Sequence, residues 1–353
     1  MQHLRHKNFR LNGNAFASAE ELIGFAEKLQ FSKQEFEIAI GKFIAEWLSE
    51  ESYILVKTSG STGIPKQIEL PKKNVANSAR ATIGYFNLYE NTTALLCLPA
   101  EFIAGKMMLV RAMLAGWDLY SVEPGREPLK NLNIHFDFAA MVPYQAFHSL
   151  SHLKKIKKMI VGGGAVPKSL EASFQKVPTR IFATYGMTET ISHIAIRPIN
   201  GPEKSMVYAA LPKVKFSLDS RDCLQIIAPE INEQTVVTND VVELISDTSF
   251  KFLGRIDNVI NSGGIKIFPE AVEEKLSDYI IFPFFIASEK DVALGERIIL
   301  VVESENEDTD YSEVFKILSA YEKPKKIYTI KNFVYTETGK VKRAETLGSI
   351  LNS

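Results

Sequence analysis

Between residues 74 and 183 the sequence alternates short apolar runs with amphipathic stretches, and no other feature constrains the fold as strongly. The apolar runs are candidates for buried strands and cover residues 94–98, 118–122, 138–142, 159–161 and 180–183. The stretches between them show helical spacing and cover residues 74–86, 105–115, 144–152 and 168–175. Strands that alternate with helices in this way predict an α/β fold with layers around a mainly parallel sheet.

The segments on either side predict further parts of the fold. Ser32 and Glu35 have the spacing of a helix-capping pair, and apolar residues then recur on one helical face as far as Leu48. A strand is expected at residues 53–56. Helical patterns are absent between residues 213 and 252, where short alternating runs predict a small β subdomain.

The segment after Arg255-Ile-Asp257 has a pattern of its own. The expected elements are helices at residues 270–279 and 311–321 and strands at residues 282–287 and 298–302. They describe a small α+β unit. The chain is therefore predicted to divide into a large N-terminal domain, residues 1–255, and a small C-terminal domain, residues 256–353.

The composition excludes several classes of protein. Of the 353 residues 46% are hydrophobic and 24% are charged, which suits a folded core. The net charge is −1, so the basic excess of a nucleic-acid or membrane-surface binder is missing. Cys97 and Cys223 match no metal or disulfide spacing and suit a reducing cytosol. We expect a cytoplasmic protein with no secretory signal, no nucleic-acid partner and no stable membrane insertion, and a homodimer stays open.

A loop rich in glycine and hydroxyl groups, residues 58–66, follows the strand at residues 53–56. Gly60 and Gly63 permit a positive φ, and consecutive N–H groups in such a loop form an anion-binding nest. Lys66 adds a cation, and the spacing is not that of a Walker A loop. Hydroxyl donors come from Thr58, Ser59, Ser61 and Thr62. These groups predict a polyphosphate-binding loop.

The loop resembles the phosphate-binding loop of the adenylate-forming superfamily, which includes acyl-CoA synthetases, peptide-synthetase adenylation domains and luciferases. Gln67 follows it where that family usually has glycine. A second string, Tyr185-Gly186-Met-Thr-Glu189, resembles the family's Y-G-x-T-E motif. The resemblance implies that Tyr185 stacks on adenine, Thr188 contacts the α-phosphate and Glu189 holds Mg²⁺. A carboxylate beside several phosphates is tolerable only with a metal ion between them.

Two more strings match the family in its order along the chain. Gly163 and Gly164 follow a predicted strand, and in the family this loop flanks adenine and the acyl pocket. Thr238-Asn-Asp240 resembles T-G-D, with Asn239 in place of glycine. The match implies that Asp240 binds the ribose hydroxyls, and asparagine tolerates a left-handed backbone better than most residues.

The C-terminal motifs complete the resemblance. Gly254-Arg255-Ile-Asp257 resembles G-R-x-D, which implies that Arg255 reaches the ribose or the phosphates and that Asp257 lies at a hinge. Residues 262–267 resemble the family's G-G-x-K-I stretch, which implies that Gly264 faces the second-step site. Residues 336–340 resemble T-x-x-G-K, and by that match Lys340 is the residue expected to drive adenylation.

The resemblance implies a two-step reaction with ATP, Mg²⁺ and coenzyme A. A carboxylate attacks the α-phosphate of ATP and releases pyrophosphate, and a thiol then attacks the acyl adenylate. A carboxylate is already a nucleophile, so the enzyme's tasks are positioning and charge neutralisation. Between the steps the family's small domain rotates, which removes Lys340 and brings in the glycine loop. Few residues precede the phosphate loop compared with the family, so we expect a shortened N-terminal part.

Two further strings narrow the choice of acid. Residues 98–106 and 190–193 resemble short o-succinylbenzoate–CoA ligases of menaquinone biosynthesis. That substrate carries a second carboxylate, and its pocket needs a cation or hydrogen-bond donors. The candidates by charge and polarity are Lys106, Ser192, His193 and Arg197.

Three alternatives stay open. They are a CoA ligase for another small aryl or acyl acid, a stand-alone adenylation protein that loads a carrier-protein thiol, and a non-catalytic nucleotide-binding relative. The presence of Glu189 and Lys340 speaks against the last. Turnover of free CoA would separate a ligase from a carrier-loading protein.

Replacing Lys340 with alanine should separate the two half-reactions. We expect Lys340→Ala to slow adenylation at least about 100-fold, because a preorganised cation is lost where charge develops. Thioester formation from a supplied acyl adenylate should stay near the wild-type rate. Pyrophosphate exchange measures the first step and CoA consumption the second. Equal loss of both would contradict a two-conformation mechanism.

Overall fold

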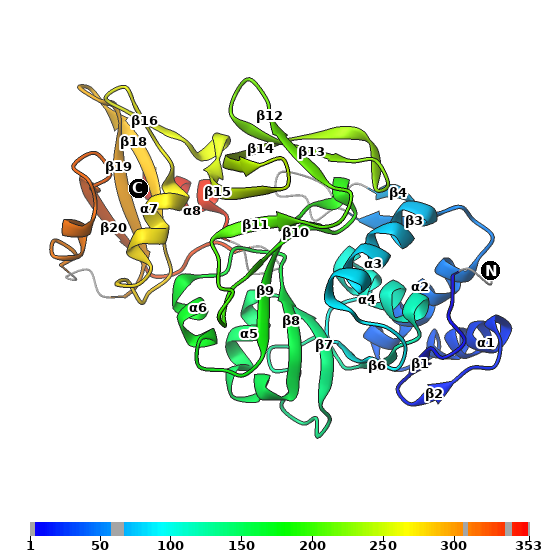
Figure 1. Cartoon of the computed structure of the whole chain (residues 1–353). Helices are drawn as coiled ribbons and strands as arrows, with labels where there is room; N and C mark the ends of the chain where they lie inside the picture. Colours follow the sequence, from blue (N-terminus) through cyan, green and yellow to red (C-terminus); the bar gives the residue numbers. More distant parts are fainter. Residues whose placement is uncertain (1–3, 58–66, 306–309, 336–340, 352–353) are drawn as a thin grey trace.

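The computed structural model describes residues 4–57, 67–305, 310–335 and 341–351. Its largest element is a sheet of thirteen strands (Figure 1). The strands expected between residues 94 and 183 are parallel neighbours in it, in the order β9-β8-β7-β5-β6. They are β5 (Thr93–Leu96), β6 (Asp118–Ser121), β7 (Phe136–Met141), β8 (Ile156–Val161) and β9 (Arg180–Gly186). The predicted α/β region with parallel strands is confirmed.

Helices connect these strands at the predicted places. They are α3 (Lys72–Phe86), α4 (Ile103–Ala115), α5 (Pro143–His148) and α6 (Lys168–Phe174). α5 is shorter than expected, because the chain continues as the 3₁₀ turn η1 (Leu150–Lys155). α4 is buried without interruption from Gly105 to Met113, so it is mostly apolar all round rather than amphipathic.

The other half of the large sheet is antiparallel. Strand direction reverses at β10 (His193–Pro198), which pairs with β9. The strands that follow are β11 (Val207–Ala210), β12 (Lys215–Leu218), β13 (Cys223–Ala228), β14 (Asn232–Ser246) and β15 (Ser249–Arg255). The predicted β subdomain is therefore present, and it is hydrogen-bonded into the same sheet as the parallel strands.

The N-terminal segment adds two short strands and two helices. They are β1 (Arg10–Leu11), β2 (Asn14–Ala15), α1 (Ala19–Leu29) and α2 (Glu35–Leu48). The predicted apolar face of α2 is buried and includes Ile44 and Trp47. The capping role expected of Ser32 is wrong. Gln34 is the N-cap residue, and the Ser32 hydroxyl accepts from the Gln34 amide and donates to Glu37, because the helix starts two residues later than a capping box requires.

A second sheet, of five strands, follows β15. Its elements are β16 (Ile260–Ser262), β17 (Ile265–Ile267), α7 (Pro269–Leu276), β18 (Phe284–Asp291), β19 (Gly295–Glu303), β20 (Lys326–Ile330) and α8 (Arg343–Leu351). The helix expected at residues 311–321 is wrong, since only the 3₁₀ turn η4 (Val314–Ile317) forms there. Tyr311 and Leu318 are buried in the core of this sheet, and that packing overrides the helical pattern. The domain division at residue 255 stays a prediction.

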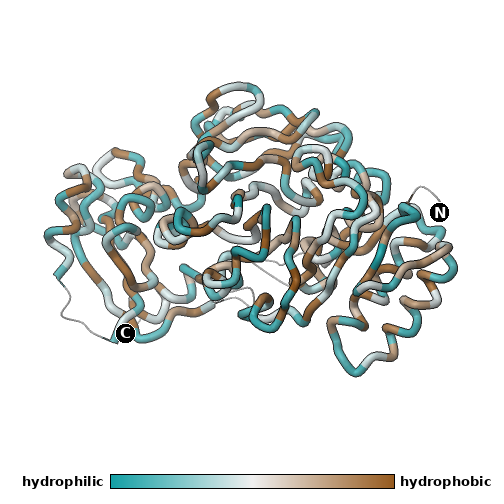
Figure 2. The backbone as a smooth tube through the Cα atoms, turned by 60° about the horizontal axis from the view of Figure 1, so that its bottom comes forward, coloured by the Kyte–Doolittle hydropathy of each residue, from teal (hydrophilic) through white to brown (hydrophobic). Residues whose placement is uncertain are grey.

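Along the backbone in Figure 2, hydrophobic residues (brown) and hydrophilic residues (teal) alternate in short stretches, and several outer turns of the chain are teal. Leu95 and Leu96 are neighbours on β5 but belong to two different buried clusters, one on each face of the large sheet. Helices thus cover both faces, which explains why the parallel strands read as continuous apolar runs. The described helices include none with the length and apolar content to cross a bilayer.

Candidate active site

The predicted phosphate loop starts and ends on a separate two-stranded ribbon. β3 (Tyr53–Lys57) pairs antiparallel with β4 (Gln67–Pro71), and Lys57 lies opposite Gln67. The residues that flank 58–66, Lys57 and Gln67, are therefore neighbours across the ribbon. The predicted site residues Thr58 to Gly63, Lys66 and Lys340 lie outside the described residues, so their roles stay predictions.

Three predicted nucleotide-binding residues, far apart in the sequence, meet in space. Tyr185 lies near the end of β9, and Asp240 on β14 lies directly opposite Arg255 on β15. The Tyr185 hydroxyl donates to the Asp240 carboxylate at 2.5 Å. Arg255 Nε lies 3.8 Å from Asp240 Oδ1. An aromatic ring, a carboxylate and a guanidinium gathered in this way are suited to a nucleoside, which offers a base for stacking and hydroxyl donors.

Burial shifts the pKa values of Tyr185 and Asp240. The Tyr185 ring packs among aromatic side chains, with centroids 5.0 Å from Phe250 and 5.9 Å from Tyr208. Burial, and then the Asp240 charge, raise the pKa of Tyr185, so its hydroxyl stays a donor. Burial also raises the pKa of Asp240, opposed by the Tyr185 hydroxyl and by Arg255. The ionised Asp240 carboxylate therefore needs hydrogen-bond donors, and ribose hydroxyls are donors.

Glycines allow the chain to turn closely around this group. Gly163 and Gly164 lie in a bend directly after β8, and φ of Gly163 is +79°. A Cβ at Gly162 would lie 2.3 Å from Thr184 Oγ1, and a Cβ at Gly186 would lie 2.3 Å from the Ser192 carbonyl oxygen. Close backbone approach therefore requires glycine at Gly186, whereas a side chain at Gly162 would have to displace the Thr184 hydroxyl.

The predicted phosphate and metal residues follow Gly186 in the 3₁₀ turn η2 (Thr188–Thr190). Thr188 is half-buried and Glu189 is exposed. Asn232 Nδ2 donates to the Glu189 carbonyl at 3.1 Å and ties the turn to β14. Within the described ranges no three His, Cys, Asp or Glu side chains cluster to hold a metal by themselves. One exposed carboxylate nevertheless fits Mg²⁺, which commonly takes one or two carboxylates together with substrate phosphates.

The residue after this turn has a strained backbone. Ile191 has φ 65° and ψ −59°, and the Ser192 amide donates to the Thr190 carbonyl at 2.6 Å, which is the geometry of a γ-turn. A β-branched residue rarely adopts a positive φ. The Thr190 hydroxyl holds the turn, because it accepts from the Met187 amide at 2.9 Å and donates to the Ser192 carbonyl at 2.8 Å. The turn reverses the chain, because β10, which starts at His193, runs antiparallel to β9.

Ser192 and His193, predicted to contact substrate, lead to a cation that sequence reasoning missed. Arg111 on α4 is 2% exposed, and its Nη2 donates to Ser192 Oγ at 3.2 Å. Ser192 Oγ also lies 3.0 Å from Ser78 Oγ, and His193 Nε2 lies 3.1 Å from Thr82 Oγ1. We call these five residues, Ser78, Thr82, Arg111, Ser192 and His193, the Arg111 cluster.

The charge of Arg111 has no counter-ion in the described part of the chain. No carboxylate lies within ion-pair distance, and its buried Nε has no hydrogen-bond partner there. Burial lowers the pKa of Arg111 to about 9, so it is still charged at neutral pH. Burial, and then Arg111, lower the pKa of His193 well below its usual value, so that imidazole is neutral. The cluster is thus a buried single positive charge with hydroxyl donors around it.

One signal in the sequence could have revealed Arg111. It is the single charged residue between Met107 and Ala115, in a stretch that is otherwise entirely apolar. A lone charge in such a stretch is buried in any fold that buries the stretch, and a buried charge needs a partner.

Two other predicted substrate contacts, Lys106 and Arg197, have ion-pair partners within the chain, and their roles toward a substrate stay predictions. Lys106 Nζ lies 3.0 Å from Glu46 Oε2 and donates to the Leu55 carbonyl at 2.8 Å, so it joins α4 to α2 and β3. Arg197 forms a buried ion pair with Glu171 that ties β10 to α6. Charge alone suggested these residues, and both charges are used inside the fold.

Gly264 occupies the two-residue turn between β16 and β17. Gly263 and Gly264 have φ values of +58° and +83°, a conformation that glycine adopts without strain. The Gly263 amide donates to the Leu294 carbonyl at 2.9 Å, so the turn rests on its own small sheet. The structure does not join Gly264 by any described contact to the nucleotide-binding residues, and its predicted role in the second step is untested.

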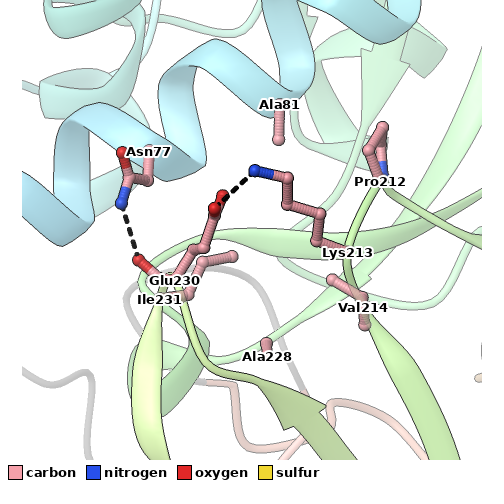
Figure 3. A pocket seen from close by; sticks show the side chains of 8 residues that line it. All are labelled: Asn77, Ala81, Pro212, Lys213, Val214, Ala228, Glu230 and Ile231. Carbon is pink, nitrogen blue, oxygen red and sulfur yellow. Dashed lines mark hydrogen bonds and ion pairs between the residues drawn. The ribbon is translucent and has the colours of Figure 1, made fainter.

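Two hollows of the described surface lie elsewhere. A crevice of about 10 Å³ separates α3 from the start of β12, and the ion pair of Lys213 with Glu230 spans it (Figure 3). Asn77 donates to the Glu230 carbonyl in the same crevice at 3.0 Å. A wider hollow of about 530 Å³ lies beside Arg5, Arg80 and Tyr89. Neither contains a predicted site residue.

Comparison with known proteins identifies relatives. The family described as AMP-binding enzyme matches residues 11–217. A 2-succinylbenzoate–CoA ligase of Escherichia coli K12 is 25% identical over 308 residues, which are 82% of this chain and 67% of that protein. The chain therefore spans about two thirds of the length of this curated relative.

Solved structures share the architecture. An acyl-CoA synthetase (AMP-forming)/AMP-acid ligase II-like protein from Dyadobacter fermentans is 35% identical, with a TM-score of 0.63 over 93% of this chain and 98% of that chain. The o-succinylbenzoate CoA synthetase (MenE) from Bacillus subtilis, in complex with the acyl-adenylate intermediate OSB-AMP, is 21% identical, with a TM-score of 0.70 over 82% of this chain and 68% of that chain. The second likeness is one of fold alone.

The raised pKa of Asp240 predicts a particular pH dependence. A carboxyl whose pKa is raised by folding binds its proton more tightly in the native state, so its contribution to stability is lost as pH rises through the folded pKa. Asp240→Asn removes this titration. We therefore expect the free energy of unfolding of Asp240→Asn to increase relative to wild type from about pH 3 upward and then to level off.

Urea unfolding of both proteins at several pH values measures this difference. Asp278→Asn, at an exposed carboxylate, is the matched control and should change the difference much less. A difference between Asp240→Asn and wild type that stays flat with pH would contradict the assignment of a desolvated carboxylate.

Proposed function

This chain belongs to the AMP-binding enzymes, and from that premise we propose that it is an ATP-dependent carboxylate–CoA ligase. Its proposed substrate is o-succinylbenzoate, an aromatic acid with a second carboxylate, and its product is the CoA thioester. The observation that carries the substrate class is Arg111, a buried cation without a counter-ion in the described chain. The two domains, residues 1–255 and 256–353, belong to the same proposal.

The cost of burying a charge supports this choice. An unpaired buried guanidinium is unfavourable by several kcal/mol, on the order of the whole stability of many domains. An enzyme that keeps such a group benefits if a ligand supplies the missing anion. A guanidinium with neighbouring hydroxyl donors matches a carboxylate in charge and geometry. The names of curated relatives, 2-succinylbenzoate–CoA ligases, agree with this class of acid.

The position of the Arg111 cluster also supports it. Ser192 belongs to the cluster and lies three residues after Glu189, the predicted Mg²⁺ ligand. The γ-turn at Ile191 separates them. A substrate held by its second carboxylate at Arg111 would therefore extend its reacting carboxylate toward the turn that holds Thr188 and Glu189. An acid with one carboxylate would leave the cluster unpaired.

The first step is in-line displacement at phosphorus. A carboxylate oxygen forms a bond to the α-phosphorus of ATP, the bond to the β-phosphate oxygen breaks, and pyrophosphate leaves. In our proposal Tyr185, Asp240 and Arg255 hold the nucleoside and the loop from Thr58 to Gly63 holds the phosphates. Bound Mg²⁺ would neutralise phosphate charge beside Glu189. Lys66, Thr188 and Lys340 stabilise the negative charge as two anions meet.

The second step transfers the acyl group to sulfur. The CoA thiolate attacks the acyl carbonyl, the bond to the phosphate oxygen breaks, and AMP leaves. The proposal assigns the glycine turn at Gly264 to this step and places Lys340 away from the site during it. Two buried free cysteines, Cys97 and Cys223, suit the cytoplasm, where we place the reaction.

A panel of carboxylic acids with ATP, Mg²⁺ and CoA tests the proposed function. We expect AMP release that depends on o-succinylbenzoate and on free CoA, with kcat/KM at least about 100-fold above that of benzoate, because only the first acid pairs Arg111. Equal use of benzoate would reject the dicarboxylate class. Acyl-adenylate formation without CoA consumption would favour the alternative of a carrier-loading protein.

Removing the Arg111 charge should raise KM for the acid without raising KM for ATP. We expect Arg111→Met to raise KM for o-succinylbenzoate about 100-fold, since one partner of a buried charge pair is lost, while KM for ATP stays within about twofold. Arg111→Lys should recover part of the loss, because a point charge replaces a planar fork. Initial rates at varied acid and ATP concentrations separate the two constants.

Arg80→Met, at an exposed arginine on α3, is the matched control and should behave like wild type. A parallel rise of both KM values in Arg111→Met would assign the residue to folding rather than to recognition of the acid.

A further inference from the structure

Asn239 stands beside the short link between the two sheets. The link is the 3₁₀ turn η3 (Ile256–Asn258), which starts directly after β15 and leads into β16. Asn239 Nδ2 donates to both oxygens of Asp257, at 3.2 and 3.3 Å. Asn239 itself lies on β14 of the large sheet. This side chain is therefore a direct tie from the large sheet to the link.

The orientation of the Asn239 amide is fixed from its other side. Arg221, in the turn before β13, donates from Nη1 to Asn239 Oδ1 at 3.1 Å and from Nη2 to the Thr238 carbonyl at 3.1 Å. Arg221 is held in turn by Asp219, to which its Nε donates at 2.9 Å. A guanidinium offers only donors and a carboxylate only acceptors, so the amide oxygen must face Arg221 and the amide nitrogen must face Asp257.

This bridge requires a short uncharged side chain with a donor and an acceptor. Glycine, the residue that the resembling family has here, cannot reach either partner. Aspartate would repel the carboxylate of Asp257. Asparagine therefore connects a cation to an anion at this position, which a glycine could not do.

The same carboxylate positions a nucleotide-binding residue. Arg255 Nη2 donates to Asp257 Oδ2 at 3.0 Å, whereas its Nε lies 3.8 Å from Asp240. The half-exposed Arg255 side chain thus takes its direction from Asp257. Asn239 therefore influences the direction of Arg255 indirectly, because both side chains bind the carboxylate of Asp257.

We propose that Asn239 is a positioning residue that fixes Asp257 against the large sheet and so sets both the link between the sheets and the direction of Arg255. The assignment rests on contacts within the chain. Only its kinetic readout rests on the proposed function.

Hydrogen exchange of a peptide that covers residues 253–262 tests the tie directly. We expect Asn239→Ala and Asn239→Asp each to speed exchange there about fivefold, because the link loses two side-chain hydrogen bonds to the sheet. Exchange in β8 should not change. Val237→Ala, at an exposed side chain on the same strand, is the matched control and should exchange like wild type.

A double variant should restore the slow hydrogen exchange of residues 253–262. Asn239→Asp together with Asp257→Asn exchanges amide and carboxylate, so the hydrogen bond between the two positions is restored with its direction reversed and Arg221 still has an acceptor. We expect wild-type exchange in this variant. Exchange that stays within about twofold of wild type in Asn239→Ala, or that is equally fast in Val237→Ala, would overturn the proposal.

Kinetics give an independent readout. In the single variants KM for ATP should rise about threefold to tenfold with kcat little changed, because Arg255 loses its fixed direction. The double variant should recover KM only in part, because it restores the hydrogen bond between positions 239 and 257 but removes the Asp257 charge that pairs with Arg255. Absence of turnover in all proteins, wild type included, would count against the proposed function, whereas the exchange measurement would still decide the role of Asn239.

Discussion

Strand β9 and strand β10 approach so closely at Gly186 that a side chain there would meet the backbone of Ser192, and most of the site depends on this approach. The chain reverses between the two strands through η2 and the γ-turn at Ile191. Tyr185 on the near side joins Asp240 and Arg255, and Ser192 on the far side joins Arg111. One tight reversal thus stands between the nucleotide-binding residues and the buried cation.

At Ile191 the packing of the fold imposes a positive φ that a β-branched residue rarely adopts. Ile191 is 1% exposed, so burial of its side chain offsets an unfavourable backbone. Thr190 is fully buried, and its hydroxyl satisfies backbone groups that the turn would otherwise leave unpaired. Such strain persists only where the surroundings determine it from several sides, and here both strands, α3 and α4 do so.

Sequence reasoning predicted the parallel strands and their connecting helices correctly. Both faces of the sheet are buried, so each strand is a short apolar run with clear ends. It also singled out Tyr185, Asp240 and Arg255, through motifs that are local strings, and the structure brings these three residues together, while their nucleotide-binding roles stay predictions. It failed where an element's end depends on packing. Ser32 does not cap α2, and burial of Leu318 replaces the expected helix with a short turn.

The contacts that sequence reasoning failed to predict join residues far apart in the chain. Lys106 and Arg197 looked free in the sequence because their partners, Glu46 and Glu171, lie on other elements. Arg111 was overlooked because a motif search passes over an apolar helix. The bridge made by Asn239 was read as a tolerated replacement, since its two partners come from separate loops. Charge and polarity in a sequence show which interactions a residue can make, but not which partner it pairs with in the fold.

Arg111 has no counter-ion among the described residues, and this has a consequence for the lifetime of the folded protein. A molecule with an uncompensated interior charge is less stable than the same molecule with that charge neutralised, so any acid that occupies the cluster raises the folded population by mass action. Proteases act on the unfolded fraction. If the proposed acid binds at the Arg111 cluster, the protein should therefore resist proteolysis better when the acid is present than when it is absent.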